Sequence, residues 1–134
     1  AFKAATRGMP THIHHGSYRH REGYKGAIAL LQEGVTALIA GDSMMTAGAL
    51  EACHNAGKRI GEEIALVGFD DFIYLRFQPS PISVVDQDVA RMGETATAKL
   101  IAAINDKHQP EGEVLETRYI PRMSTAHQLD GATP

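Results

Sequence analysis

Thr36-Ala37-Leu38-Ile39-Ala40-Gly41-Asp42 is a continuous apolar run that ends in glycine and aspartate, and the later segment Ile64-Ala65-Leu66-Val67-Gly68-Phe69-Asp70-Asp71 repeats this pattern. Short apolar runs of this kind are typical of parallel strands that are buried on both faces. Ligands of open α/β sheets bind at the carboxyl ends of the strands. We therefore expect Asp42 and Asp70 at the rim of one crevice, where they can accept hydrogen bonds from hydroxyls or amines of a small polar molecule.

Helix capping is the alternative role for these two aspartates. Asp42 precedes an expected helix over residues 43–56, where its carboxylate would accept a backbone N–H and complement the helix dipole. Capping fits Asp70 less well, because Phe72-Ile73-Tyr74-Leu75 is a poor first helical turn.

The remaining sequence continues the alternation of strands and helices that a parallel sheet requires. Helices are expected over residues 2–7, 19–33, 43–56 and 89–106, the last capped by Asp88, and strands over 11–15, 36–42, 64–70 and 113–121. Residues 82–85 are interpreted as an extended connector and residues 124–134 as a frayed polar tail.

The composition fits one compact globular unit. The chain has 134 residues, of which 43% are hydrophobic, and no apolar run reaches the roughly 20 residues of a membrane span. Its start lacks the apolar centre of a signal peptide, so we expect a soluble, cytoplasmic protein. The single cysteine, Cys53, excludes an internal disulfide and suggests a small buried side chain. With a net charge of −3, this stretch alone is not expected to bind DNA.

Two apolar surfaces need a partner to pack on. The first is a stripe at helical spacing on the expected helix 89–106, formed by Val89, Met92, Ala96, Leu100, Ala103 and Ile104. The second is the segment after Asp71, which a monomer would rarely expose. It predicts a subunit interface formed by Phe72, Ile73, Tyr74, Leu75 and Phe77, unless the aromatic side chains fold back on the sheet.

Several short sequence blocks follow one another in a characteristic order and spacing. They are Gly23-Tyr24, Gly41-Asp42-Ser43-Met44-Met45-Thr46-Ala47-Gly48-Ala49-Leu50, the run from Ala56 to Asp71, Pro79 and Pro81 before Ile82, and Gln87 with Met92-Gly93-Glu94-Thr95-Ala96. Together they resemble the effector-binding domain of the lactose/galactose-repressor (LacI/GalR) family of transcription regulators, which is related to periplasmic sugar-binding proteins.

The resemblance implies a periplasmic-binding-protein-like type I fold, with an open, mostly parallel sheet and helices on both faces. In that family two α/β subdomains close over an effector, and closure changes how a dimer presents its DNA-binding heads. The chain is expected to be the C-terminal part of such a domain. It would comprise a subdomain of about residues 8–86 and 118–126, a helix of about 88–107 that crosses to the absent N-terminal subdomain, and a tail of 127–134.

The resemblance also implies partners and site residues. The effector would be a sugar, a sugar derivative, a nucleoside or a purine, the protein a homodimer, and operator DNA would be bound only by an absent N-terminal domain. Tyr18 matches an aromatic that often stacks on the effector ring, and Asp70 matches an acid that commonly hydrogen-bonds the effector. Gly41 replaces an Asn common in sugar-binding members, and Val89 replaces an aromatic wall of some members, which predicts a wider pocket. No cofactor is implied.

An enzyme is a remote alternative function. Gly41-Asp42-Ser43 resembles the nucleophile block of the GDSL esterases, but the nearest base, in Asp106-Lys107-His108, has the wrong spacing. We therefore expect no catalysis.

A metal site and a transport protein are two further alternatives. His12 and His14 would share one face of a strand, with His15 and His20 nearby, but a structural zinc site needs four ligands, so no metal is expected. A solute-binding protein of an ABC transporter would share the fold and the crevice.

Overall fold

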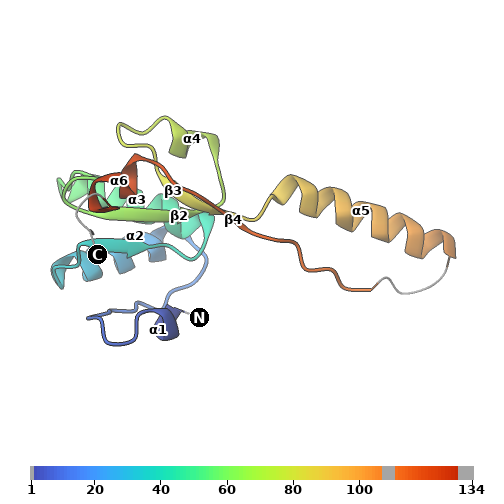
Figure 1. Cartoon of the computed structure of the whole chain (residues 1–134), viewed down its shortest axis with the longest axis horizontal. Coiled ribbons are helices and arrows are strands. Elements are labelled where there is room, and N and C mark those ends of the chain that lie inside the picture. The colour runs from blue at the N-terminus through green and yellow to red at the C-terminus, as the bar shows by residue number, and fades with distance from the viewer. Residues whose placement is uncertain (1, 107–110, 130–134) are drawn as a thin grey trace.

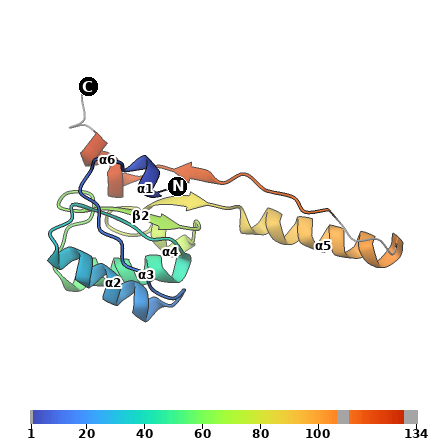
Figure 2. The same cartoon turned by 90° about the horizontal axis from the view of Figure 1, so that it is seen from below.

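A four-stranded sheet lies at the centre of the computed structural model, which describes residues 2–106 and 111–129 (Figure 1). The helices are α1 (Phe2–Ala5), α2 (His20–Gln32), α3 (Ser43–Asn55), α4 (Ile73–Arg76), α5 (Val89–Asp106) and α6 (Met123–Leu129), and the strands are β1 (Ala37–Ile39), β2 (Ala65–Phe69), β3 (Ser83–Asp86) and β4 (Arg118–Ile120). The strand order is β1-β2-β3-β4, in which β1, β2 and β3 are parallel and β4 is antiparallel to β3. Figure 2 shows α2 and α3 on one side of the sheet and α6 on the other. The predicted fold class is confirmed.

The core lies between the sheet and the helices that cover it. Its buried members come from β1, β2, β3, α2, α3 and the segments around them: Ala27, Leu38, Ala49, Ala52, Cys53, Ile64, Leu66, Leu75, Ile82 and Val84. Burial raises the pKa of the Cys53 thiol to about 11, because the thiolate would lose its hydration. The expectation that Cys53 is a small buried side chain is confirmed.

Two glycines bring the first half of α3 against the start of α2. A Cβ atom on Gly23 would lie 2.6 Å from the Cα of Met45, and one on Gly48 would lie 2.5 Å from the backbone nitrogen of Tyr24. A side chain at either position would collide with backbone rather than with a movable side chain, so the two helices can approach this closely only at glycine. The contact fixes the N-terminal ends of both helices relative to each other.

The C-terminal segment begins with the helix α6 (Met123–Leu129), which packs on the sheet, so the expectation of a frayed tail over residues 124–134 is wrong for residues 124–129. Ser124 is fully buried, and its hydroxyl donates to the carbonyl of Leu66 (2.6 Å) and accepts from the backbone N–H of Ser83 (2.8 Å). The Ser83 and Thr125 hydroxyls are 2.7 Å apart. The three hydroxyls keep their hydrogen bonds on burial, because backbone groups of Leu66, Ser83 and Arg122 pair with them.

The interpretation of residues 82–85 as a connector is also wrong. Val84 pairs with Gly68 of β2 on one side and with Ile120 of β4 on the other, so β3 is an inner strand of the sheet. Ile82, Ser83 and Val84 are fully buried. The expected last strand exists but is shorter than predicted, since only Arg118–Ile120 pair with β3.

The strand expected over residues 11–15 is absent from the sheet. A cavity of about 860 Å³ separates this segment from β1, with Thr11, His12, Ile13 and His14 on one side and residues 36–41 on the other. Because strand assignment requires ladder hydrogen bonds to a neighbour, the segment is extended chain without strand pairing.

The long helix α5 has the predicted bounds and extends away from the sheet (Figures 1 and 2). Asp88 caps it, accepting the backbone N–H of Arg91 at 3.2 Å. Its apolar stripe faces solvent in this chain, with Val89, Leu100 and Ile104 at least half exposed. The helix therefore carries the unmatched apolar face that its sequence predicts. No helix within residues 2–106 and 111–129 has both the length and the apolar character needed to cross a membrane.

Candidate effector-binding site

The carboxyl ends of the three parallel strands place polar groups along one edge of the sheet. Gly41 and Asp42 follow β1, Asp70 follows β2, and Gln87 follows β3. Because adjacent parallel strands end at the same edge, this edge is the rim at which a ligand of an open α/β sheet binds. The first turns of α2 and α3 start at the same edge.

Asp42 is the N-cap of α3, as the capping alternative predicted. Its Oδ1 accepts the backbone N–H groups of Met44 (2.8 Å) and Met45 (3.2 Å). Cap interactions of this kind typically contribute about 1 kcal/mol to helix stability. Asp42 therefore has a structural role at the rim, whether or not it also contacts a ligand.

A buried threonine ties the ends of β1 and β2 together. The Thr46 hydroxyl donates to the carbonyl of Asp42 (2.8 Å) and accepts from the backbone N–H of Phe69 (2.9 Å). A Cβ atom on Gly68 would lie 2.5 Å from Cγ2 of Thr46, so the strand must be glycine at this point. Sequence reasoning missed this residue. The available signal was a polar side chain on the same helix face as Ala49 and Cys53.

Asp70 differs from Asp42 because it caps no helix. The cap position of α4 belongs to Phe72, which makes no side-chain cap hydrogen bond. Asp70 has a left-handed backbone with φ 60°, is 8% exposed, and accepts a hydrogen bond from Nε2 of Gln87 on Oδ1 (2.9 Å). Aspartate tolerates this conformation better than most residues, and such positions cluster at functional sites.

Tyr74 of α4 lies close enough to this rim for the rim charges to act on it. Burial raises the pKa of its phenol, and the negative charges of Asp42 and Asp70 raise it further. Its ring stacks on Phe72, with centroids 5.9 Å apart. The sequence had placed Tyr74 in a subunit interface only, so its proximity to the two aspartates was not foreseen.

The other predicted site residues are accessible. Tyr18, which precedes α2, is 79% exposed, and Val89, the first residue of α5, is 55% exposed. Gly41 is exposed and has no heavy atom within 4 Å of a Cβ placed on it, apart from its chain neighbours. All three positions are therefore accessible to solvent.

Asp71, unlike its neighbour Asp70, forms ion pairs with two arginines. Nη2 of Arg122 donates to both carboxylate oxygens of Asp71 (2.7 and 2.8 Å), and Nη2 of Arg76 donates to Oδ2 (2.8 Å). Burial by itself would raise the pKa of Asp71, but the hydrogen bonds from Arg122 and Arg76 outweigh it and hold that pKa below its usual value. Asp71 is thus a structural acid that joins the end of β2 to the β4–α6 turn.

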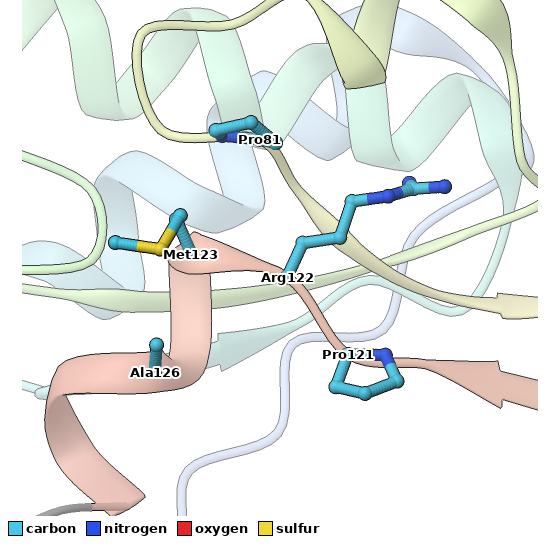
Figure 3. Close-up of a pocket in the computed structure, with 5 residues that line it drawn as sticks. All are labelled: Pro81, Pro121, Arg122, Met123 and Ala126. Carbon is cyan, nitrogen blue, oxygen red and sulfur yellow. The ribbon is translucent and has the colours of Figure 1, made fainter.

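The same arginine borders a hollow of about 430 Å³ on the α6 side of the sheet (Figure 3). Its other lining residues are Pro81, Pro121, Met123 and Ala126. Figure 3 shows the Arg122 side chain directed away from Met123 and Ala126, so its charge is not aimed into the hollow. Without a cluster of polar groups, the hollow offers little to orient a polar ligand.

We expect the Asp71–Arg122 pair to make stability depend on acid pH. Because the folded-state pKa of Asp71 is depressed, its contribution is complete above the ordinary aspartate range of about 4 and is lost as the pH falls through the lower folded value. Arg122→Met should lower the free energy of unfolding by about 3 kcal/mol at pH 7, and the difference from wild type should shrink towards pH 3. Urea unfolding at both pH values measures this.

Arg76→Met is the matched control, because its side chain is 49% exposed whereas that of Arg122 is 16% exposed. A loss below about 1 kcal/mol is expected there. Equal losses in the two variants, or a pH-independent loss in Arg122→Met, would contradict the assignment.

Two alternative sites find no further support in the structure. No group of three or more potential metal ligands lies together within the described parts of the chain, and His20 pairs instead with Glu51 (3.0 Å). Ser43 is the first residue of α3 behind its Asp42 cap. Lys107 and His108, which the esterase alternative needs, lie outside the described residues.

Comparison with known proteins shows the family of this chain. The family model of the periplasmic binding protein-like domain matches residues 2–125. This chain belongs to that family, as an effector-binding domain of the LacI/GalR type. The LacI/GalR domain is 30% identical over 115 residues to the HTH-type transcriptional regulator MalR of Streptomyces coelicolor, a match that covers 85% of the chain and 33% of that regulator.

Solved structures of transcriptional regulators superpose on the domain. A probable LacI family transcriptional regulator from Corynebacterium glutamicum is 33% identical with a TM-score of 0.76, covering 92% of this chain and 44% of that one. The transcriptional regulator CelR in complex with cellobiose is 27% identical with a TM-score of 0.79, covering 92% of this chain and 40% of that one. The LacI/GalR domain thus spans about a third of the length of the curated regulator above and less than half of each solved chain. These relatives are transcriptional regulators rather than enzymes.

Proposed function

We propose that this chain is the effector-sensing and dimerisation part of a LacI/GalR-type transcription regulator, in which a small polar metabolite controls operator binding. The chain would supply the C-terminal wall of the effector crevice, with a body of about residues 8–86 and 118–126 and α5 crossing to the opposite subdomain. Because α6 packs on β2, we include it in that body rather than in a tail. Operator contacts would belong to a separate DNA-binding domain, since this chain has a net charge of −3.

The observation that carries the proposal is the state of Asp70. It stands at the end of β2 with its backbone in the left-handed region and is almost buried. A neutral amide satisfies one of its oxygens, so the carboxylate keeps its charge for a donor on the ligand. Asp42, Tyr18, Gly41 and Val89 complete the proposed effector-binding wall around it.

A saccharide is the effector class that we favour. The solved relative CelR is in complex with cellobiose, and a carboxylate and a tyrosine ring suit the hydroxyls and the apolar face of a sugar ring. A nucleoside or purine would be the alternative outcome of a binding screen. The solute-binding protein of an ABC transporter is not favoured, because the matched relatives are regulators.

We expect Asp70→Ala in the regulator that contains this chain to weaken effector binding by at least tenfold. The physical reason is that a hydrogen bond to a charged group in a partly buried site contributes about 1.5–3 kcal/mol. Isothermal titration of the wild-type and variant regulators with a saccharide panel, including cellobiose and maltose, measures the change. Asp71→Ala would not serve as a control, because its arginine pairs stabilise the fold. Glu62→Ala would serve, because Glu62 is an exposed acid in the connection between α3 and β2. Unchanged affinity in Asp70→Ala would refute the assignment.

The second part of the proposal is a homodimer formed through α4 and its flanks. Phe72, Ile73, Tyr74 and Phe77 are 45%, 61%, 38% and 80% exposed, which leaves four large, mostly apolar side chains exposed within six residues. Leu75 must be removed from the predicted interface. It is fully buried in the core, because a single helical turn sends it inward while its neighbours point outward.

A further inference from the structure

Gln87 is held between two anchored residues and points back to the end of β2. On one side, Oδ1 of Asp86 accepts the backbone N–H of Asp88 at 3.1 Å. On the other, Asp88 caps α5 through the backbone N–H of Arg91. With its backbone fixed on both sides, Gln87 directs its side-chain amide to Asp70 and donates to Oδ1 at 2.9 Å.

The two neighbouring aspartates are satisfied in opposite ways. Asp71 receives two guanidinium groups, which fill both of its oxygens and neutralise it. Asp70 receives one neutral amide on one oxygen, and within residues 2–106 and 111–129 no other side chain donates to its carboxylate. Its Oδ2 and its full negative charge therefore stay available, although the side chain is only 8% exposed.

We infer that Gln87 is a positioning residue for Asp70: its amide fixes the plane of the carboxylate so that Oδ2 faces the crevice as the acceptor for a ligand hydroxyl. The ligand contact itself rests on the proposed function above. A lysine or arginine at position 87 would cancel the charge that the ligand needs, and an apolar residue would let the carboxylate rotate. A neutral donor on a short rigid connection achieves the orientation without either cost.

A ligand-free measurement tests the contact. In the 134-residue chain at constant pH 7, we expect Asp70→Asn to move the side-chain amide proton resonances of Gln87, because an amide oxygen is a weaker hydrogen-bond acceptor than a carboxylate. Glu62→Gln, the same substitution at an exposed acid, should leave those resonances unchanged. Unchanged Gln87 amide resonances in Asp70→Asn would overturn the inference.

A second measurement tests the consequence for binding. With cellobiose as the probe in isothermal titration of the regulator that contains this chain, we expect the apparent dissociation constant to rise at least fivefold in Gln87→Leu. Gln32→Leu, the same substitution on an exposed position at the end of α2, should leave binding unchanged. Equal affinities in the two leucine variants would overturn the inference.

The two measurements separate the inference from the proposed function. A Gln87 amide signal that responds to Asp70→Asn, together with no cellobiose binding by the wild-type regulator, supports the positioning role and counts against the saccharide assignment. Cellobiose binding without that response supports the saccharide assignment and counts against Gln87.

Discussion

Gly48→Ala is expected to lower the free energy of unfolding by about 3 kcal/mol or more, although alanine is the better helix former. The added Cβ would lie 2.5 Å from the nitrogen of Tyr24 and 2.9 Å from the carbonyl carbon of Gly23, and it would approach the carbonyl oxygen of His20 as well. Because all three contacts are backbone atoms of α2, the two helices must separate. Overpacking of this kind typically costs 1–3 kcal/mol where side chains can yield, and here they cannot.

The glycine of α5 provides the control for this prediction. Gly93 also lies inside a helix, but a Cβ there would meet no heavy atom within 4 Å beyond its own helix. Gly93→Ala should therefore leave stability unchanged or raise it by up to about 1 kcal/mol, as helix propensity alone predicts. Urea unfolding followed by circular dichroism compares the two variants. A stabilised Gly48→Ala would show that the close crossing of α2 and α3 is incorrect.

Leu75→Glu and Ile73→Glu are expected to have opposite outcomes, although they place the same charge two residues apart in α4. Leu75 is fully buried, so a carboxylate there would lose its hydration and leave the core unfilled; we expect a loss of about 4 kcal/mol or more and an unfolded chain. Ile73 is 61% exposed, so Ile73→Glu should keep the fold. On the proposed interface, its charge would face a second copy and split the dimer.

Two measurements on the same samples separate these effects. Circular dichroism reports folding, and sedimentation equilibrium reports the oligomeric state. The sequence predicted Leu75 at the subunit interface, but the structure places it in the core. If Ile73→Glu folded and still sedimented as a dimer, α4 would lie outside the interface. A folded Leu75→Glu would contradict the packing of α4 on the sheet.

Local patterns in the sequence determined the elements that depend on nearby residues. The apolar runs that end at Asp42 and Asp70 are β1 and β2, and the helix predicted over residues 89–106 has those bounds. Its cap, Asp88, is set by a hydrogen bond to a residue three positions away, which a sequence pattern can capture. The resemblance to LacI/GalR regulators rested on the order of such local blocks, and the family match confirms it.

The position of Asp70 at the rim was also predictable, because an acid after a buried strand needs only the strand's direction to be placed. The partner of Asp70, Gln87, could not be predicted in the same way. Gln87 reaches Asp70 from the end of the neighbouring strand β3, and Tyr74 approaches the same rim from α4, so both depend on how separate elements are arranged.

Only the tertiary structure decided the elements whose partners lie far away in the sequence. Residues 82–85 became an inner strand because β2 and β4 pair with both of its edges, whereas residues 11–15 did not become a strand because a cavity separates them from β1. Ser124 can be buried because backbone groups of Leu66 and Ser83 satisfy its hydroxyl. Strand pairing and the burial of polar groups both require a partner, and the sequence around a residue does not say where that partner lies.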